Sequence, residues 1–372
     1  MRKLVFITGT RADYGKLEPL ALKSVKLGFE VHFFVTGMHL MERYGLTSIE
    51  VARNSEFRRR EFPNQNEGDN QDQILANTIN GFSTFLNQTR PDLVLIHGDR
   101  IEALAASLVC STNYIRSAHI EGGEISGTID EVYRHCNTKL CTAHLVSSIK
   151  AKKRVVQLGE HPDRIFVIGS PELDRHDKPT GVSIKQVLTR YDIPWNDFGV
   201  AIFHPVTSEL DNLKAQANSF YSALNQSGKN FVIIAPNNDP GKDYIFSTIN
   251  ELPKERFRLI PSMRFHYFSE LLRHAKALVG NSSAGVREAP FLGLPSLDIG
   301  TRQNKRNSSA SIVQANAFDT SLIKNFLESN WGKKYPKNTS FGVGDSSEKF
   351  RKILLGGKLW GLPLQKVFFD DV

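Results

Sequence analysis

The sequence predicts an α/β protein built from two Rossmann-like domains with a central cleft. Three observations predict this fold class. Short apolar runs alternate with amphipathic helical segments, the apolar runs end in glycine and polar residues, and 372 residues exceed what one ordinary core holds. We expect an N-terminal domain over residues 1–175, a C-terminal domain over 176–345, and a helical tail over 346–372 that packs back on the first domain.

The first half of the chain reads as a series of parallel strands and helices. Residues 93–120 predict strand, turn, helix and strand, and a long polar loop carrying Asp130 follows them. The segment 54–72 is polar and aperiodic, so we expect a mobile loop there. The other expected strands are 3–8, 30–36, 145–148 and 164–168, and the other expected helices are 17–27, 38–44, 73–89, 137–144 and 149–158.

The second half repeats the same alternation. Pro179 and Gly181 mark residues 175–182 as the interdomain linker. Strands are expected within 198–207, 230–241, 256–261, 277–283 and 296–300, and helices at 210–225, 244–252, 267–274, 285–291 and 346–354.

Composition and charge narrow the function classes. The net charge of +8 favours an anionic ligand, and its scattered lysines and arginines lack the interleaved aromatics typical of nucleic-acid binding. No apolar run approaches the ~20 residues of a membrane span, and the N-terminus is interrupted too early for a signal peptide. Cys110, Cys136 and Cys141 lack paired spacing and are interpreted as reduced thiols. We therefore expect a cytoplasmic protein with no nucleic-acid or membrane partner.

Carboxylates gather where two neighbouring strands are expected to end. Asp99 follows the strand at 93–96, Glu121 follows the strand ending at 120, and Asp130 lies in the next loop. Ligands of open parallel sheets bind beyond the carboxyl ends of strands, so these acids are expected to share one crevice. Several unpaired carboxylates are of no use in a packed core, whereas acid/base chemistry on a sugar or a phosphate ester requires them.

Two turns carry residues suited to an anion. Arg11 and Lys16 lie at the start of the first helix, where free N–H groups favour a phosphate, although a solvated pair explains them equally well. In the second half, Ser282 and Ser283 precede a helix that carries Glu288, and an ordinary N-cap explains one of these serines but not both. Arg302 follows a later strand and is a candidate phosphate clamp.

Histidine and asparagine side chains follow other strands of the sheets. His204 lies at the end of the strand beginning at 198, a position that favours a functional role over a structural one. Asn237 follows the strand within 230–241 and is interpreted as a sugar or ribose contact. His97 and His119 lie in or beside buried strands, so we interpret them as supporting hydrogen-bonding residues rather than proton carriers.

These motifs carry a resemblance to a known family. In chain order, GTRADYGKL, HGDR, HIEGGEISGTIDE, FHPVT, GNSSAGVREAP and GTRQ resemble the UDP-N-acetylglucosamine 2-epimerase family over nearly the whole chain. The loop GGEISGTIDE and the GNSS/GTRQ pair resemble its hydrolysing branch, which includes bacterial sialic-acid pathway enzymes. The resemblance implies a GT-B type fold with UDP bound between the domains. It also implies a homo-oligomer, either a dimer or a tetramer.

The resemblance also assigns roles to individual residues. Asp99, Glu121 and Asp130 match the family's catalytic carboxylates, and His204 matches its cleft histidine. Met263 falls where the family's backbone meets the uracil, although the family usually has other residues there. The residues that match UDP contacts are Arg11, Arg100, Asn237, Ser282, Ser283, Glu288 and Arg302.

The implied reaction converts UDP-N-acetylglucosamine and water into N-acetylmannosamine and UDP through a glycal. Departure of UDP acidifies the C2 hydrogen, Asp99 or Asp130 removes it, and a proton returns to the opposite face of C2. The scheme requires neither a metal nor a cofactor. Alternatives are the same reaction on a UDP-2,4-diacetamido-trideoxyhexose for legionaminic acid, non-hydrolysing epimerisation, a GT-B glycosyltransferase, and a nucleotide-sugar binding protein.

Overall fold

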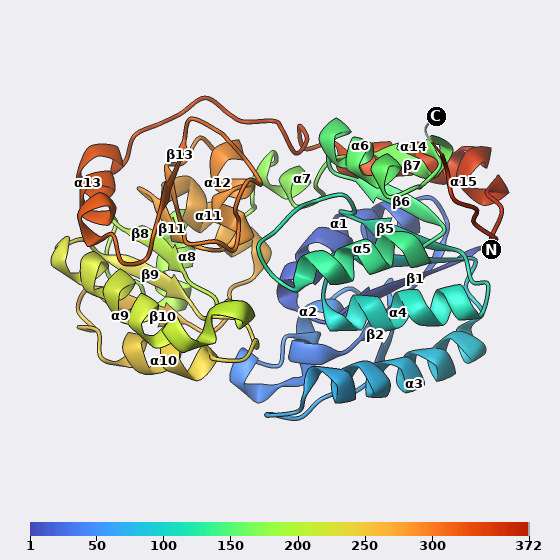
Figure 1. The fold of residues 1–372 in the computed structure, drawn as a ribbon, viewed down its shortest axis with the longest axis horizontal. Helices are drawn as coiled ribbons and strands as arrows, with labels where there is room; N and C mark the ends of the chain where they lie inside the picture. Colours follow the sequence, from blue (N-terminus) through green and yellow to red (C-terminus); the bar gives the residue numbers. More distant parts are fainter. Residues whose placement is uncertain (371–372) are drawn as a thin grey trace. The chain divides into compact units, whose positions relative to one another are not determined.

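The computed structural model describes residues 1–370, which form two compact units (Figure 1). Unit 1 comprises residues 1–124, 130–177 and the chain from Phe341 onward, and unit 2 comprises 125–129 and 178–340. Each unit has its own parallel sheet with helices on both faces.

The sheet of unit 1 has seven parallel strands in the order β3-β2-β1-β4-β5-β6-β7. The strands are β1 (Lys3–Thr8), β2 (Glu30–Val35), β3 (Arg58–Glu61), β4 (Leu93–His97), β5 (Ser117–Ile120), β6 (Ala143–Val146) and β7 (Ile165–Val167). The helices are α1 (Arg11–Lys26), α2 (Ser48–Ala52), α3 (Gln71–Thr89), α4 (Ile101–Thr112), α5 (Asp130–Leu140), α6 (Ile149–Gln157), α7 (Leu173–His176), α14 (Ser346–Leu355) and α15 (Gly357–Gly361). Short 3-10 turns lie at Gly37–Leu40, Glu42–Tyr44 and Pro162–Arg164.

The sheet of unit 2 has six parallel strands in the order β10-β9-β8-β11-β12-β13. The strands are β8 (Gly199–Ile202), β9 (Phe231–Ile234), β10 (Phe257–Ile260), β11 (Leu278–Gly280), β12 (Ser296–Ile299) and β13 (Ile312–Ala315). The helices are α8 (Ile184–Tyr191), α9 (Leu210–Gln226), α10 (Lys242–Asn250), α11 (Phe265–His274), α12 (Glu288–Phe291) and α13 (Thr320–Asn330), with 3-10 turns at Thr207–Glu209 and Ser283–Gly285.

The central strands are apolar on both faces because helices cover both sides of each sheet. In β1, Leu4 and Phe6 pack into one core cluster, and Val5 and Ile7 pack into the cluster on the opposite face. Burying each such side chain stabilises the fold by roughly 1.5–3 kcal/mol. This continuous apolar run is why the sequence identified the central strands directly.

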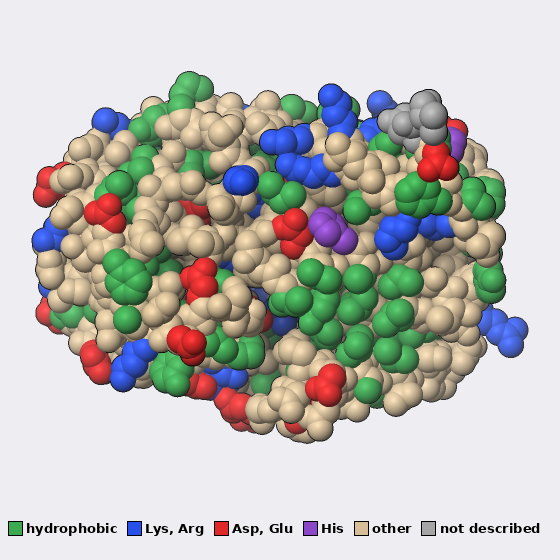
Figure 2. All heavy atoms as spheres, viewed as in Figure 1, with side chains coloured by type: hydrophobic (Ala, Val, Ile, Leu, Met, Phe, Trp, Pro, Cys, Tyr) green, Lys and Arg blue, Asp and Glu red, His purple; other side chains and the backbone are tan. Residues whose placement is uncertain are grey.

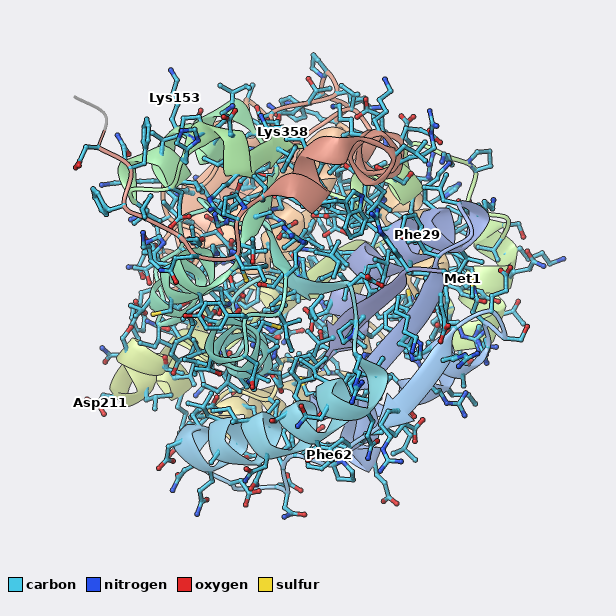
Figure 3. All side chains as sticks on the ribbon, turned by 90° about the vertical axis from the view of Figure 1, so that its right-hand side faces the viewer. Met1, Phe29, Phe62, Lys153, Asp211 and Lys358 are labelled. Atoms are coloured by element: carbon cyan, nitrogen blue, oxygen red, sulfur yellow. The ribbon has the colours of Figure 1, made fainter. Side chains whose placement is uncertain are left out.

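The segment expected as a mobile loop over residues 54–72 contains a strand instead, so that prediction was wrong. Arg58–Glu61 pairs in parallel with β2 as the edge strand β3, and all four of its side chains are exposed. Phe62 follows β3 and lies with its ring centroid 5.8 Å from that of Phe34 (Figure 3). A charged edge strand has no apolar period to detect, and its charges discourage pairing with another chain.

Three other expectations are corrected. The predicted helix at 285–291 is a 3-10 turn followed by the four-residue helix α12, and the expected helix at 38–44 is two 3-10 turns. Asp130 does not lie within a loop, because it begins α5. The sequence reading also missed β13, α8 and α13.

The C-terminal helices pack on unit 1. The Asp174 carboxylate caps the start of α14 by accepting hydrogen bonds from the backbone N–H groups of Ser346 and Ser347, each at 2.7 Å. Near α15, the Trp360 ring stacks on Phe29 with 6.1 Å between centroids, and Figure 3 views this end of the unit. Further along, the ammonium of Lys366 donates to three carbonyls at the end of α5, including that of Cys141 at 2.8 Å.

Within residues 1–370, no helix combines the length and the apolar character that crossing a bilayer requires.

Candidate active site

The carboxyl edge of the unit 1 sheet brings two of the predicted acids onto adjacent strands. His97, the last residue of β4, pairs in register with Ile120, the last residue of β5. Glu121 follows Ile120 directly and Asp99 lies two residues after His97, so parallel pairing delivers both carboxylates to the same edge. The structure therefore places both residues at the carboxyl edge of the sheet, and the crevice that they were expected to share stays a prediction.

Asp99 is held by a buried arginine. The Arg134 guanidinium, 1% exposed, forms an ion pair with Asp99 and donates through Nη1 to the Glu124 carbonyl at 3.0 Å. The Asp99 side chain keeps 27% of its surface exposed. A buried guanidinium favours the ionised form of a carboxylate that lies against it, and the catalytic role of Asp99 stays a prediction.

Glu121 is almost fully buried and surrounded by donors. Lys16 Nζ lies 3.1 Å from Glu121 Oε2, and Ser170 Oγ donates to Oε1 at 3.3 Å. His97 Nε2 approaches Oε2 at 3.2 Å. Lys16 also lies 3.7 Å from Glu172, so it is engaged in buried ion pairs, and its predicted phosphate contact stays a prediction.

The backbone at Glu121 is strained. Its φ of +68° lies in the left-handed region, which costs a non-glycine residue roughly 1–3 kcal/mol. The strain is held by the Glu121 N–H, which donates to the Leu145 carbonyl of β6 at 3.0 Å. Two residues later, a Cβ on Gly123 would lie 2.2 Å from the Ala151 carbonyl oxygen, so only glycine fits that position. Strain of this kind is concentrated at functional positions.

Asp130 occupies the first turn of α5. Its side chain is partly buried, and the helix dipole favours a negative charge at that end. The preceding segment Ile125–Ile129 belongs to unit 2, where the Gly127 N–H donates to the Arg302 carbonyl at 3.1 Å.

His97 and His119, for which the sequence predicted the same supporting role, differ in their contacts. His119 is fully buried, with Nε2 2.7 Å from the Gly98 carbonyl and Nδ1 3.1 Å from the Thr138 hydroxyl. Burial lowers the pKa of His119 to about 3, so the ring is neutral. His97 instead lies between the carboxylates of Glu121 and Asp13.

In unit 2, His204 is fixed through its backbone and its ring. Asn281 accepts from the His204 N–H at 2.7 Å and donates to its carbonyl at 2.8 Å. The Asn237 N–H donates to His204 Nδ1 at 3.0 Å. Because Nδ1 accepts a hydrogen bond, the neutral ring carries its proton on Nε2, which makes Nε2 the donor toward a ligand.

The remaining residues of the predicted nucleotide site lie around the ends of β11 and β12. Ser282 caps the 3-10 turn that begins at Ser283, with its hydroxyl accepting from the Ala284 N–H at 3.4 Å. Arg302 Nη1 donates to the Asn281 carbonyl at 3.4 Å, and Glu288 begins α12. Since α12 is one turn long, its dipole adds little, and any anion held here depends on hydroxyl, amide and guanidinium donors.

Gly280 immediately precedes this group, and its replacement by alanine is expected to destabilise unit 2. Its φ is +128°, and a Cβ there would lie 2.0 Å from the Ile202 carbonyl oxygen. We expect Gly280→Ala to lower the free energy of unfolding by at least about 2 kcal/mol, measured by urea denaturation. Gly361→Ala is the matched control, because a Cβ there meets nothing within 4 Å. Equal stabilities of the two variants would contradict this prediction.

Arg11, Arg100 and Met263 complete the set predicted from sequence. Arg11 begins α1 and lies 3.7 Å from Glu50, and Arg100 precedes α4 with its Nε 3.4 Å from Glu102. The Met263 side chain packs into a core cluster of unit 2. The family-based roles of all three stay predictions.

The sequence reading gave no role to several residues that organise the site. Asn281, 1% exposed, ties β8 to β11, and Ser170 and Glu172 surround Glu121 and Lys16. Asn281 belongs to the motif GNSSAGVREAP, so its place directly after a strand was a signal that could have identified it. The other contacts join residues far apart in the chain, which a single sequence does not reveal.

Among the described residues 1–370, no group of three or more histidine, cysteine, aspartate and glutamate side chains is arranged to hold a metal ion.

The chain has two α/β units, each with a parallel sheet, which is the architecture of a two-Rossmann protein of the GT-B type. Acids lie at one sheet edge of unit 1, and unit 2 supplies a histidine with serine and arginine donors. Solved structures confirm this fold class. The chain matches a Neisseria meningitidis UDP-GlcNAc 2-epimerase bound to UDP-GlcNAc with TM-score 0.78 and 20% identity, covering 95% of this chain and 99% of that one. It matches a Staphylococcus aureus structure with UDP with TM-score 0.76 and 17% identity over all of both chains.

The sequence pattern described as UDP-N-acetylglucosamine 2-epimerase matches residues 21–355, and the chain belongs to this enzyme family. A Neisseria meningitidis serogroup B relative named UDP-N-acetylglucosamine 2-epimerase is 40% identical, covering 100% of this chain and 99% of the relative. A Legionella pneumophila relative named UDP-N,N'-diacetylbacillosamine 2-epimerase (hydrolyzing) is 30% identical over 95% of this chain and 96% of its own. The Escherichia coli polysialic acid biosynthesis protein P7 is 29% identical over 87% of this chain and 85% of its own.

Proposed function

We propose that this enzyme is a hydrolysing UDP-N-acetylglucosamine 2-epimerase that forms N-acetylmannosamine and UDP for sialic acid biosynthesis. The observation that carries the proposal is the pair of carboxylates in unit 1, each of which has cationic neighbours. Asp99 forms an ion pair with the buried Arg134, and Glu121 lies within ion-pair distance of Lys16 and His97. The 40% identity to the Neisseria meningitidis relative supports the substrate.

In this proposal unit 2 binds the nucleotide. Ser282, Ser283 and Arg302 supply hydrogen-bond donors to the diphosphate, and Asn237 and Glu288 contact the sugar and ribose. His204 donates from Nε2 to the departing phosphate oxygen, because its Nδ1 is occupied by the Asn237 N–H. Stabilising this leaving group is the main electrostatic task of the reaction.

Residues of unit 1 then transfer the protons at C2. The C1–O bond to UDP breaks with its electron pair leaving on the diphosphate, and Asp99 removes the C2 proton to give the glycal. Water adds its oxygen to C1 while Glu121 delivers a proton to the opposite face of C2, which inverts that carbon. Asp130 lies one helical turn before Arg134 on α5, which suits it to orient the sugar or the water. No metal or cofactor enters these steps.

Proton NMR in deuterated water tests the proposal. With UDP-N-acetylglucosamine we expect N-acetylmannosamine carrying deuterium at C2 and one equivalent of free UDP. Formation of UDP-N-acetylmannosamine without free UDP would make the enzyme non-hydrolysing. Turnover only when an acceptor is added would favour a glycosyltransferase.

A second substrate follows from the Legionella pneumophila relative, whose name specifies a diacetamido sugar. The UDP-2,4-diacetamido-trideoxyhexose is therefore the second substrate to offer in the same experiment. Turnover of this analogue alone would move the enzyme to legionaminic acid synthesis.

We also propose a cytoplasmic homo-oligomer. Figure 2 shows hydrophobic side chains gathered over α4, where Leu104 and Leu108 are partly exposed. A second copy of the chain would cover this apolar surface.

A further inference from the structure

Behind Glu121 lies an arrangement that the reaction as described does not use. We propose that His97 stores the proton that Glu121 returns to C2, and that Asp13 keeps the His97 ring charged. Both residues act through Glu121 rather than on the sugar, so they are positioning residues. The inference deepens the proposed function and rests on it.

The geometry suits a proton store. The His97 side chain is 7% exposed, with Nε2 3.2 Å from Glu121 Oε2 and Nδ1 3.4 Å from Asp13 Oδ1. A neutral imidazole carries a hydrogen on one nitrogen only, so it would leave one carboxylate facing a lone pair. The imidazolium carries an N–H on each of the two nitrogens that lie at ion-pair distance from a carboxylate, so the charged ring suits both neighbours.

The surrounding charges favour the same form. Burial and Lys16 lower the pKa of His97, but the carboxylates of Glu121 and Asp13 outweigh them, so the net shift is upward. Burial raises the pKa of Asp13, but His97 and Arg100 outweigh it, so that carboxyl stays ionised. Glu172 adds a negative charge on the far side of Lys16, 3.7 Å from its ammonium. These groups come from α1, the two strand ends and the segment before α7.

The proton balance is simple. Glu121 relays the Nε2 proton of the imidazolium to C2 of the glycal, so Glu121 is ionised again at the end of the step, and water supplies hydroxide to C1 and releases its remaining proton to solvent. His97 is then neutral with its hydrogen on Nδ1, facing Asp13. Once the product leaves, solvent protonates Glu121, and Glu121 passes that proton to Nε2 of His97.

A proton store is needed because Glu121 itself is held ionised. Lys16 at 3.1 Å and Ser170 at 3.3 Å are both placed to stabilise its carboxylate, which favours the form of Glu121 that has no proton to give. Paired with His97, it becomes one donor whose proton is present whenever the ring is charged. The Glu121–His97 pair can therefore donate a proton to C2 even though the Glu121 carboxylate is stabilised in its ionised form.

The first test needs no substrate. In nitrogen-15 NMR of the full-length protein, we expect His97 to be doubly protonated at pH 7.5 and Asp13→Asn to lower its titration midpoint. A neutral His97 at pH 7.5 would overturn the proposal. His119 is the matched reference in the same spectrum, because it is buried on the adjacent strand but contacts a carbonyl and a hydroxyl.

The second test separates the two halves of the reaction. His97→Gln is expected to slow hydration of added 2-acetamidoglucal by about a hundredfold, the scale of a lost proton donor, and to release glycal in place of N-acetylmannosamine. Asp13→Asn should shift the basic limb of glycal hydration to lower pH, since it removes the charge that holds the His97 proton. A structural defect would slow both halves equally and leave the product ratio unchanged.

The outcomes remain distinguishable. If His97→Gln fails to fold, Asp13→Asn carries the test, because its side chain is 17% exposed and the change is isosteric. Unchanged glycal hydration in Asp13→Asn at every pH would overturn the proposal. If the wild-type enzyme turns over neither nucleotide sugar nor glycal, the proposed function fails first, while the NMR result still reports whether His97 is charged.

Discussion

The Asp99→Asn variant loses about three orders of magnitude in kcat while its affinity for UDP changes little. Asparagine keeps the size of the side chain and removes its basicity, and a lost general base costs roughly 10²–10⁴ in rate. UDP affinity is retained because the proposed diphosphate donors Ser282, Ser283 and Arg302 belong to unit 2, whereas Asp99 and its partner Arg134 belong to unit 1. Steady-state kinetics and calorimetric titration with UDP measure the two quantities.

Glu131→Gln is the matched control for Asp99→Asn. Glu131 neighbours Asp130 on α5 and lies 3.5 Å from His135, and the proposed chemistry assigns it no role. We expect its kcat to stay within about threefold of the wild type, the effect of an exposed pair. Full turnover by Asp99→Asn would remove Asp99 from the mechanism, and equal losses in both variants would indicate a structural effect of altering this edge.

The central strands could be predicted because burial on both faces imposes a continuous apolar run. The run at β1 reads Leu4, Val5, Phe6 and Ile7, with alternate residues entering the cores on opposite faces. The edge strand β3 has no such requirement, since its four charged side chains are all exposed. Its place in the sheet is decided by pairing with β2, a tertiary contact that the local sequence does not encode.

Positions at the site could likewise be predicted, but their partners could not. Strand ends located Asp99, Glu121 and His204, because the polar residue after each apolar run is visible in the sequence. Lys16 reaches Glu121 across 105 positions of the chain, and Asn281 reaches His204 across 77. Such contacts decide charge states and tautomers, so the chemistry of each predicted residue emerged only with the fold.

Acid is expected to unfold this protein steeply between pH 6.5 and 4, because several histidines are buried in neutral form. Burial lowers the pKa of His39 to about 4 and that of His119 to about 3, against 6.5 in an unfolded chain. As pH falls below 6.5, the histidines bind protons in the unfolded state but not in the folded state. The free energy of unfolding therefore decreases until the pH reaches the pKa of the folded state. The losses amount to about 3 kcal/mol for each ring by pH 4, and that of His119 continues to about 5 kcal/mol near pH 3, a large part of a typical folding free energy.

Neighbouring groups add to this loss or leave it unchanged. Burial also lowers the pKa of His144 to about 4, so that ring acts in the same direction. His97 has a raised pKa, and its contribution is fully present below pH 6.5 and lost only as pH rises, so it does not offset the effect. Urea midpoints measured from pH 7.5 to 4.5 should fall throughout the lower part of this range, and less steeply in His119→Asn, which removes one titrating ring. Midpoints that stay constant down to pH 4.5 would mean that these rings take up protons within the fold.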